Sequence, residues 1–218
     1  MPRRRPPKRC PWPAPGDRLY LAYHDREWGV PVYQDRRIFE FLILEIFQAG
    51  LSWRTVLHKR ENFRKAFAKF DYEKVARFGA RDVKRLLRDE GIIRNRAKIH
   101  AAIHNARLFI EVREEFGTFS RYMWSRVGGA PIAHRIHAME DYRPFTDEAA
   151  LWAQDLKKRG FKFLGPVVLY AHMQATGMVN DHLVSCFRYR QVGRRQADLS
   201  HERRDDTTHN AVAHVPER

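Results

Sequence analysis

Apolar residues recur at spacings of three and four along most of the 218-residue chain, which is the period of helices that bury one face. Residues 35–48 are apolar nearly all round, so they predict a buried helix that ends before Gly50. Residues 96–116 predict a long helix. No segment alternates apolar and polar residues between hairpin turns, as a half-buried strand would. The pattern therefore predicts an all-α fold.

The same spacing predicts several shorter helices. Asp71 and Asp147 stand where a side chain can cap the start of a helix, and Gly91 stands where a helix should stop. Residues 128–147 are marked by Gly and Pro and predict a long connection. The other helical segments expected are 53–70, 71–78, 80–91, 119–124, 147–158 and the apolar segment 165–179, which is expected in the centre of the core.

The chain is strongly basic, with 41 Lys and Arg against 26 Asp and Glu and a formal charge of +15. Residues 1–10 supply +5 and residues 188–218 supply +2, so +8 remains on residues 11–187. Such a balance favours a polyanionic partner, although a solvated basic face without a ligand gives the same charge. Both ends lack apolar periodicity, so we expect disordered tails at 1–8 and 191–218 around one domain at 9–190.

Several classes of protein are excluded by the composition. Two cysteines cannot make a disulfide-rich secreted scaffold. No apolar run reaches the roughly 18 residues of a membrane span, and the basic first residues carry no apolar signal-peptide core. We therefore expect a soluble cytoplasmic protein with no membrane partner.

Four potential metal ligands lie near the two ends of the chain: Cys10, His24, His182 and Cys186. The spacing His-x3-Cys would place two ligands one helical turn apart, and two Cys with two His form a complete tetrahedral set for structural zinc. A buried core histidine with two inert thiols is the plainer reading of the same residues. A disulfide between the two cysteines is a third reading, disfavoured inside cells.

A second group combines aromatic side chains with one acid. Tyr20, Tyr23 and Trp28 precede Glu45, which is embedded in the apolar segment 35–48, and Trp53 follows. A carboxylate in apolar surroundings pays a desolvation penalty and tends to mark a site, unless it points outward into solvent. Aromatic residues at such spacings are also common in cores. Together with the basic charge, the group suits a cationic planar ligand such as a damaged base.

The third group is the segment RLLRDEGIIRNRAKIHAAI at residues 85–103. It reads as a helix, a short turn and a second helix that opens with Arg94, Arg96 and Lys98. A helix-hairpin-helix of this kind presents backbone N–H groups and positive charge to a phosphate. An ordinary helical hairpin with a solvated basic edge is the alternative.

These residues belong to longer blocks that resemble one known family. CPW, LAYHDREWGVP, LEIFQAGLSWRTVLHKRENFRKAF, GIIRNRAKIHAAIHNAR, LKKRGFKFLGP and YAHMQATGMVNDH, in this order over about residues 9–190, are similar to the DNA-3-methyladenine glycosylase I family. The resemblance implies an all-α member of the helix-hairpin-helix glycosylase superfamily. It also implies one structural Zn²⁺ per chain, bound by Cys10, His24, His182 and Cys186, which joins the chain ends.

The resemblance further implies a pocket for the damaged base. Glu45 matches the carboxylate that hydrogen-bonds the methylated adenine, and Tyr23 and Trp53 match aromatic residues that stack on it. The residues expected to line the rest of the pocket are Trp12, Tyr20 and Trp28.

For DNA binding, Leu51 matches an apolar residue at the tip between two helices that fills the gap left in the duplex by the flipped nucleotide. Arg94, Arg96 and Lys98 are expected to contact DNA phosphates. Ile46 departs from the family pattern, which often has glycine beside the acid, and this could alter the shape of the pocket. The basic N-terminal tail and the long C-terminal tail are also outside the family's core pattern.

The implied activity is hydrolysis of the N-glycosidic bond of 3-methyladenine in double-stranded alkylated DNA, with free 3-methyladenine and an abasic site as products. Residues 97–140 contain no Asp, so the catalytic Asp common among superfamily relatives is missing. The turn Arg94-Asn95-Arg96 offers no lysine as a lyase nucleophile. We therefore expect a monomeric, monofunctional glycosylase. The alternative is a non-catalytic DNA-binding or damage-sensing module on the same scaffold.

Overall fold

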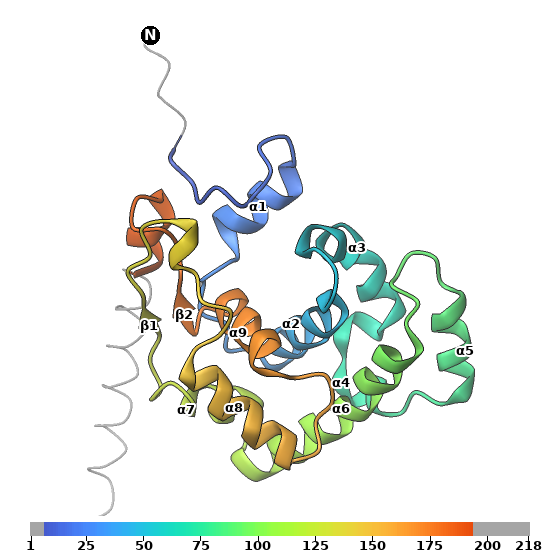
Figure 1. Cartoon of the computed structure of the whole chain (residues 1–218). Coiled ribbons are helices and arrows are strands. Elements are labelled where there is room, and N and C mark those ends of the chain that lie inside the picture. The colour runs from blue at the N-terminus through green and yellow to red at the C-terminus, as the bar shows by residue number, and fades with distance from the viewer. Residues whose placement is uncertain (1–6, 194–218) are drawn as a thin grey trace, which may run out of the picture.

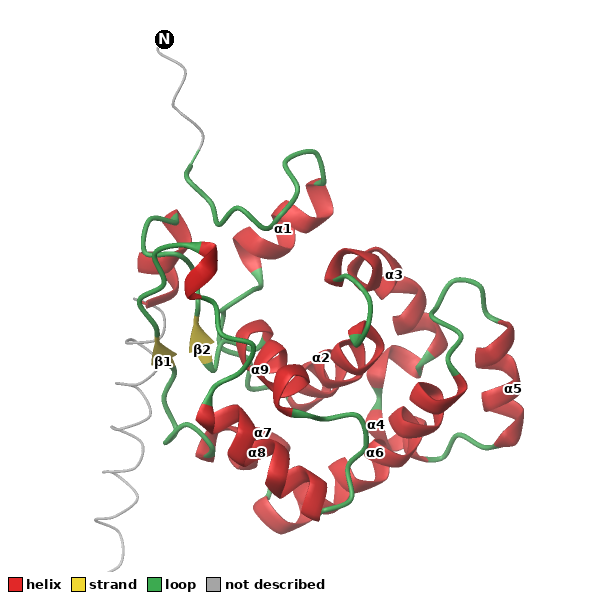
Figure 2. Cartoon of the chain, viewed as in Figure 1, coloured by secondary structure: helices red, strands yellow, loops and turns green. Residues whose placement is uncertain are grey.

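The computed structural model describes residues 7–193, which fold into packed helices with two very short strands (Figures 1 and 2). Within these residues no helix is both long enough and apolar enough to traverse a lipid bilayer. The elements in chain order are α1 Arg18–Arg26, α2 Asp35–Gln48, α3 Trp53–Ala66, η1 Ala68–Phe70, α4 Tyr72–Ala76, α5 Ala80–Arg88, α6 Arg96–Phe116, α7 Phe119–Ser125, β1 Ile132–Ala133, η2 Met139–Asp141, α8 Asp147–Lys158, α9 Pro166–Ala175 and β2 Val179–Asn180.

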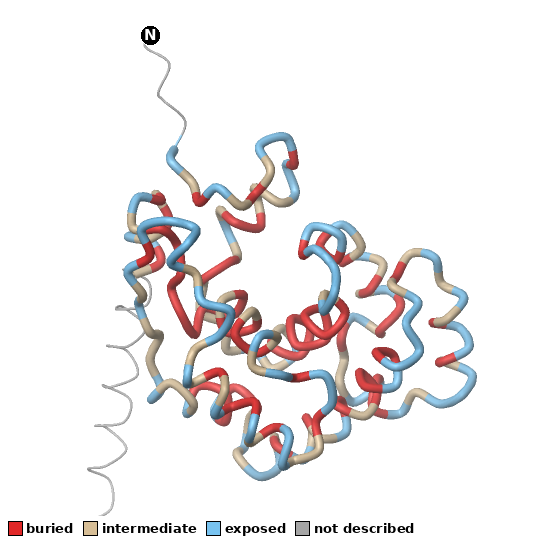
Figure 3. The backbone as a smooth tube through the Cα atoms, in the orientation of Figure 1, coloured by how far each residue is buried: buried red, intermediate tan, exposed pale blue. Residues whose placement is uncertain are grey.

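Helix α2 lies at the centre of the core and packs against α3, α6, α7 and α9 (Figure 3). Every residue from 38 to 47 is buried, because the helix is apolar on all its faces and neighbours cover each one. Glu40 and Glu45 are the two acids in this stretch. Arg60 and Arg64 of α3 pair with Glu40, with Nε to Oε1 distances of 2.7 and 2.9 Å, whereas Glu45 has no such partner among the described residues.

The predicted bounds of α2 and α6 are confirmed, and Asp71 caps α4 as expected. The predicted helix 53–70 is too long, because α3 ends at Ala66 and residues 68–70 take positive φ angles of 52–56°. Asp147 is the first residue of α8 rather than its cap, since the side chain of Thr146 accepts from the backbone of Ala149. Helix α1, capped by Asp17, was not predicted.

The all-α prediction is wrong in one detail. Strands β1 and β2 form a parallel pair, with Ile132 opposite Val179 and Ala133 opposite Asn180. Two-residue strands are too short to show an alternating pattern of apolar and polar residues, so no local signal predicts them. The pair ties the long connection 128–147 to the segment after α9.

Both ends of the described chain meet beside this pair. The backbone N–H of Phe187 donates to the carbonyl of Lys8 at 2.9 Å. Gly177, with φ of +70°, lies so near the backbone of Val30 that a Cβ would come within 2.3 Å, so no larger residue fits this crossing. Residues 187–193 are helical and Val192 is fully buried, while the remainder of the predicted tails lies outside the described residues.

Candidate functional site

A cavity of about 220 Å³ lies among α1, α2, α3, α9 and the loop around η2. This volume suits one flat heterocycle rather than a larger ligand. All six predicted pocket residues line it: Trp12, Tyr20, Tyr23, Trp28, Glu45 and Trp53. The other lining residues, which the sequence did not reveal, are Gln48, Met139, Tyr142, Ala171 and Gln174.

Glu45 is the acid of this cavity. The residue is 3% exposed, and its Oε2 atom has no hydrogen-bond partner among the described residues. Burial raises the pKa of the carboxyl to about 8, so most molecules carry it protonated at pH 7 in the free protein. A buried polar atom without a partner is rare in folded proteins and is explained when a ligand supplies the missing bond.

The aromatic residues form a continuous wall. Trp12 packs edge-on against Trp28 with ring centroids 5.0 Å apart, and Tyr23 lies 5.2 Å from Trp53 at 45°. Stacking a base between two parallel rings would separate them by roughly 7 Å, so in this conformation Tyr23 and Trp53 cannot hold a base from both sides. They form adjacent walls instead. The indole Nε1 atoms of Trp12 and Trp53 are buried without partners among the described residues, like Glu45 Oε2.

Asp181 organises the opposite side of the cavity. Its buried carboxylate accepts from Gln174 Nε2 at 2.7 Å and from the Tyr170 hydroxyl at 2.6 Å. Its backbone carbonyl accepts from the Tyr142 hydroxyl at 2.8 Å. Because the amide nitrogen of Gln174 is held in this way, its carbonyl oxygen is the group left to accept. The acid directly before His182 was the available sequence signal, and it was overlooked.

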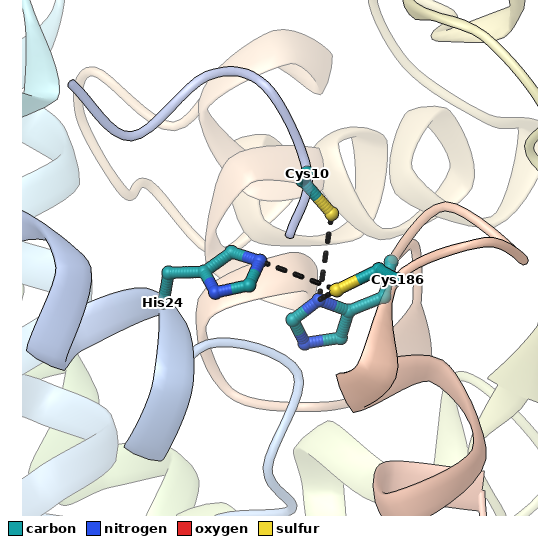
Figure 4. A group of neighbouring side chains, drawn as sticks. Cys10, His24 and Cys186 are labelled. Atoms are coloured by element: carbon teal, nitrogen blue, oxygen red, sulfur yellow. Dashed lines mark hydrogen bonds between the residues drawn. The ribbon is translucent and has the colours of Figure 1, made fainter. Parts of the chain in front are cut away.

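The four predicted metal ligands converge on one point (Figure 4). Their donor atoms all lie within 4.8 Å of one another, and all four residues are buried. Cys186 Sγ lies 3.6 Å from His24 Nε2 and 3.7 Å from His182 Nδ1, and Cys10 Sγ lies 3.6 Å from the same Nδ1. The expected helical spacing of His182 and Cys186 is wrong, because both lie in turns before the helical residues that start at 187.

Outer hydrogen bonds orient these ligands. His24 Nδ1 contacts Asp25 Oδ1 at 2.8 Å, and His182 Nε2 contacts the carbonyl of Trp28 at 3.1 Å. Each imidazole therefore keeps its other nitrogen directed at the cluster. The pKa of the Cys186 thiol is lowered by hydrogen bonds, the largest from Cys10 and the others from His182 and His24. The arrangement can hold a metal ion, with the free thiols not joined in a disulfide.

The predicted DNA-facing residues divide into two groups. Leu51 is 45% exposed in the short loop between α2 and α3. Arg94 is exposed in the turn between α5 and α6, and Arg96 is exposed at the first position of α6. Lys98 is buried, and its Nζ donates to the carbonyls of Phe47 at 3.1 Å and Ala49 at 2.5 Å. The expectation of a phosphate contact is wrong for Lys98, because its ammonium group caps the C-terminal end of α2.

Ile46 is fully buried in the core and does not line the cavity. The departure from the family pattern at this position is therefore a difference in the core and not in a side chain that lines the cavity.

Comparison with known proteins identifies the family of the chain. The methyladenine glycosylase family matches residues 12–189. DNA-3-methyladenine glycosylase 1 of Escherichia coli strain K12 is 46% identical over 182 residues, which cover 84% of this chain and 97% of the relative.

Two solved structures are also similar. A crystal structure of a 3-methyladenine DNA glycosylase I has a TM-score of 0.79 and 47% identity, over 83% of this chain and 98% of the other. A variant 3-methyladenine DNA glycosylase I in complex with 3-methyladenine has a TM-score of 0.76 and 38% identity, over 78% and 92%. Because the match spans nearly the whole described chain and nearly the whole of each relative, this protein belongs to the methyladenine glycosylase family.

Proposed function

We propose that this chain is a DNA-3-methyladenine glycosylase, which hydrolyses the N-glycosidic bond of 3-methyladenine in alkylated double-stranded DNA and leaves an abasic site. The observation that carries the proposal is the buried, unpartnered carboxyl of Glu45 in an aromatic cavity sized for one base. The relatives are named for the same activity, and one of them is bacterial, which supports action on cytoplasmic DNA.

Recognition depends on complementary charge and hydrogen bonds. Methylation at N3 makes the adenine cationic in DNA, and a cation is attracted to the faces of Tyr23 and Trp53. Its exocyclic amino group donates, so it supplies the bond that Glu45 Oε2 lacks. The cationic base favours the ionised form of Glu45, which only accepts hydrogen bonds, so guanine, with a carbonyl oxygen at the corresponding edge, would find no donor there. Glu45 therefore selects the base, and the aromatic wall supplies affinity.

The chemical step asks little of the protein. The positive charge makes the methylated base a good leaving group, so the protein must flip the nucleotide, hold the base and admit water. Asn95 caps α6 with its side chain, and Lys98 is held by the carbonyls of Phe47 and Ala49. No amine of the α5–α6 turn is then available as a lyase nucleophile, which supports a monofunctional enzyme.

The Cys10, His24, His182 and Cys186 cluster fits one structural Zn²⁺ per chain. In a tetrahedral zinc site with bonds of about 2.3 Å to sulfur and about 2.0 Å to nitrogen, sulfur and nitrogen ligands lie about 3.5 Å apart. Three of the four sulfur–nitrogen distances are 3.6–3.7 Å, and all four donor atoms lie within 4.8 Å of one another. When bound, the ion crosslinks the chain ends and has no open position for catalysis, because four protein ligands surround it.

The DNA contacts follow from the exposed residues. As in a helix-hairpin-helix, the α5–α6 turn with Arg94 and Arg96 binds phosphates, and Leu51 fills the gap that the flipped nucleotide leaves. A monomer suffices for this, since one chain contributes the cavity, the hairpin and the tip.

A base-release assay tests the proposal. The parent protein should release free 3-methyladenine from methylated duplex DNA, and Glu45→Gln should release it more slowly. Glu111→Gln, which changes an exposed carboxylate of α6, should behave as the parent. DNA binding without any base release by the parent would instead favour a damage-sensing module.

A further inference from the structure

Asp181 is a buried acid whose carboxylate is held by three side chains. Its Oδ2 atom accepts from the Tyr170 hydroxyl at 2.6 Å and from Gln174 Nε2 at 2.7 Å, and its Oδ1 atom lies 2.6 Å from His134 Nδ1. Tyr170 and Gln174 stand four residues apart on α9 and therefore share one face of the helix. A buried carboxylate is costly unless it is hydrogen-bonded, so three donors hold this one in a single orientation.

Strands β1 and β2, which lie side by side in Figure 1, bring His134 to this acid. Ala133 lies opposite Asn180, so the next position in the same parallel register pairs His134 with Asp181. The backbone N–H of His134 donates to the carbonyl of Asn180 at 3.2 Å and extends the pairing by one step. The short parallel pair thus fixes the acid from the outer side, while α9 meets it from the inner side.

Asp181 also decides which end of the Gln174 amide faces the base cavity. A carboxylate only accepts hydrogen bonds, so the amide atom that lies 2.7 Å from Oδ2 is the nitrogen. Gln174 lines the cavity, whereas Asp181 does not. The amide nitrogen is therefore bound outside the lining, and the carbonyl oxygen is the atom that can accept from a ligand.

The cavity then has two acceptors on two different helices, Glu45 of α2 and Gln174 of α9. These helices pack against each other in the core. The amino group of 3-methyladenine carries two N–H groups, and each needs its own acceptor when it is buried. A second acceptor therefore adds affinity for an amino group and penalises a carbonyl oxygen at the same place.

We propose that Asp181 is a positioning residue for base selection, because it orients Gln174 so that Oε1 accepts the second N–H of the amino group. Glu45 accepts the first N–H, and His134 supports Asp181 from the loop. The inference rests on the proposed function, since it requires 3-methyladenine in the cavity. It gives His134 and Asp181 a role in selection although neither side chain lines the cavity.

Calorimetry of the full chain with two free bases tests the proposal. 3-Methyladenine carries the amino group, and 3-methylhypoxanthine carries a carbonyl oxygen in its place. Gln174→Met keeps the length of the side chain but removes the acceptor, so the affinity for 3-methyladenine should fall about tenfold and that for 3-methylhypoxanthine should not fall. Gln154→Met, which changes an exposed amide of α8, is the matched control and should bind both bases as the parent does.

Asp181→Leu removes the group that holds the amide and leaves the cavity lining in place. The amide of Gln174 is then free to turn its nitrogen inward, so the ratio of the two affinities should fall about tenfold, as in Gln174→Met. Because Asp181 acts through Gln174, the double variant should show no further fall in this ratio beyond that of Gln174→Met. A purely structural role for Asp181 would weaken the binding of both bases alike and leave the ratio unchanged, which would overturn the proposal.

If Asp181→Leu does not fold, Gln174→Met decides, because an unchanged ratio in that variant removes the acceptor on which the positioning role depends. Base release from methylated duplex DNA is measured separately for the parent. A parent that binds neither free base and releases none from DNA would overturn the proposed function and this inference together. A parent that prefers 3-methyladenine, with an equal preference in Gln174→Met, would overturn the inference alone.

Discussion

Two clusters of buried polar groups lie side by side in this protein, and they differ in how their hydrogen bonds are satisfied. In the metal cluster, both imidazoles contact sulfur on one side and an oxygen acceptor on the other. In the base cavity, the Oε2 atom of Glu45 and the indole nitrogens of Trp12 and Trp53 have no partner among the described residues. Trp12 separates the two clusters, with its ring 5.1 Å from that of His24.

The difference teaches which buried polar groups serve the fold and which serve a ligand. Burying a polar group costs free energy unless its hydrogen bonds are replaced. The metal cluster replaces them internally and so stabilises the chain ends. In the cavity the free-energy cost of burying these polar groups is not offset in the free protein. A bound base would offset it by supplying the missing hydrogen bonds. Each of the following predictions tests one side of this contrast.

The largest effect is expected in the metal cluster. Cys186→Ser should lower the zinc content to well below one ion per chain and destabilise the fold by on the order of 5 kcal/mol, because the bound ion contributes folding free energy directly. Metal analysis and thermal unfolding measure the two quantities. Ser185→Ala, an exposed neighbour in the same turn, is the matched control and should change neither. Full zinc content in Cys186→Ser would contradict the ligand assignment.

At Glu45 a substitution is expected to raise the stability of the fold, whereas Cys186→Ser should lower it. The carboxyl has a pKa of about 8 in the folded protein and 4.5 as its ordinary value, so the folded state holds the proton more tightly. The contribution of the protonated carboxyl to the free energy of unfolding is therefore fully present below pH 4.5. It is lost progressively as the pH rises from 4.5 to about 8. Glu45→Gln cannot ionise, and it should be more stable than the parent by about 3 kcal/mol at pH 7.

Urea unfolding at pH 5, 7 and 8 measures this difference, which should widen with pH. The same variant should bind free 3-methyladenine more weakly by about 1–3 kcal/mol, because its amide cannot supply the charge-assisted acceptor that the ionised carboxyl offers to the amino group of the base. Glu111→Gln should show neither change. A stability difference that does not vary with pH would mean that Glu45 is not titrating in the cavity.

A smaller effect is expected at Lys98, a buried group whose bonds are satisfied as in the metal cluster. Lys98→Met should lower stability by about 2 kcal/mol, because two carbonyls at the end of α2 lose their donor. Its slope of log DNA affinity against log salt should equal that of the parent. Arg96→Ala should show the reverse, with unchanged stability and a slope reduced by about one. A reduced slope for Lys98→Met would instead support the prediction from the sequence that Lys98 contacts a phosphate.

The sequence predicted the long helices well, because their apolar positions repeat over several turns. The bounds of α2 and α6 agree with the pattern. Strands β1 and β2 and the positive φ angles at 68–70 escaped prediction, since neither depends on a local apolar period. Tertiary contacts set them, and a single sequence does not record such contacts.

The site residues were predicted from the resemblance to the family, because residue types alone left plainer readings open for the same positions. The four metal ligands and six pocket residues converge as expected. Gln174 and Tyr142 were missed because they act through Asp181, and Lys98 was misassigned because a lysine in a basic segment looks exposed. Lys98 is buried because the C-terminal end of α2 packs against it, and this tertiary contact cannot be read from the local sequence.

The metal cluster also constrains the order of events during synthesis. Cys10 and His182 are separated by 172 positions, so Cys10 and His24 must wait without their partners until nearly all the helices have left the ribosome. Closing so long a loop in an unfolded chain is slow, whereas a folded helical core brings the ends together beforehand. Capture of the proposed metal ion would then be a late step in maturation and would fasten a core that the helices have already built.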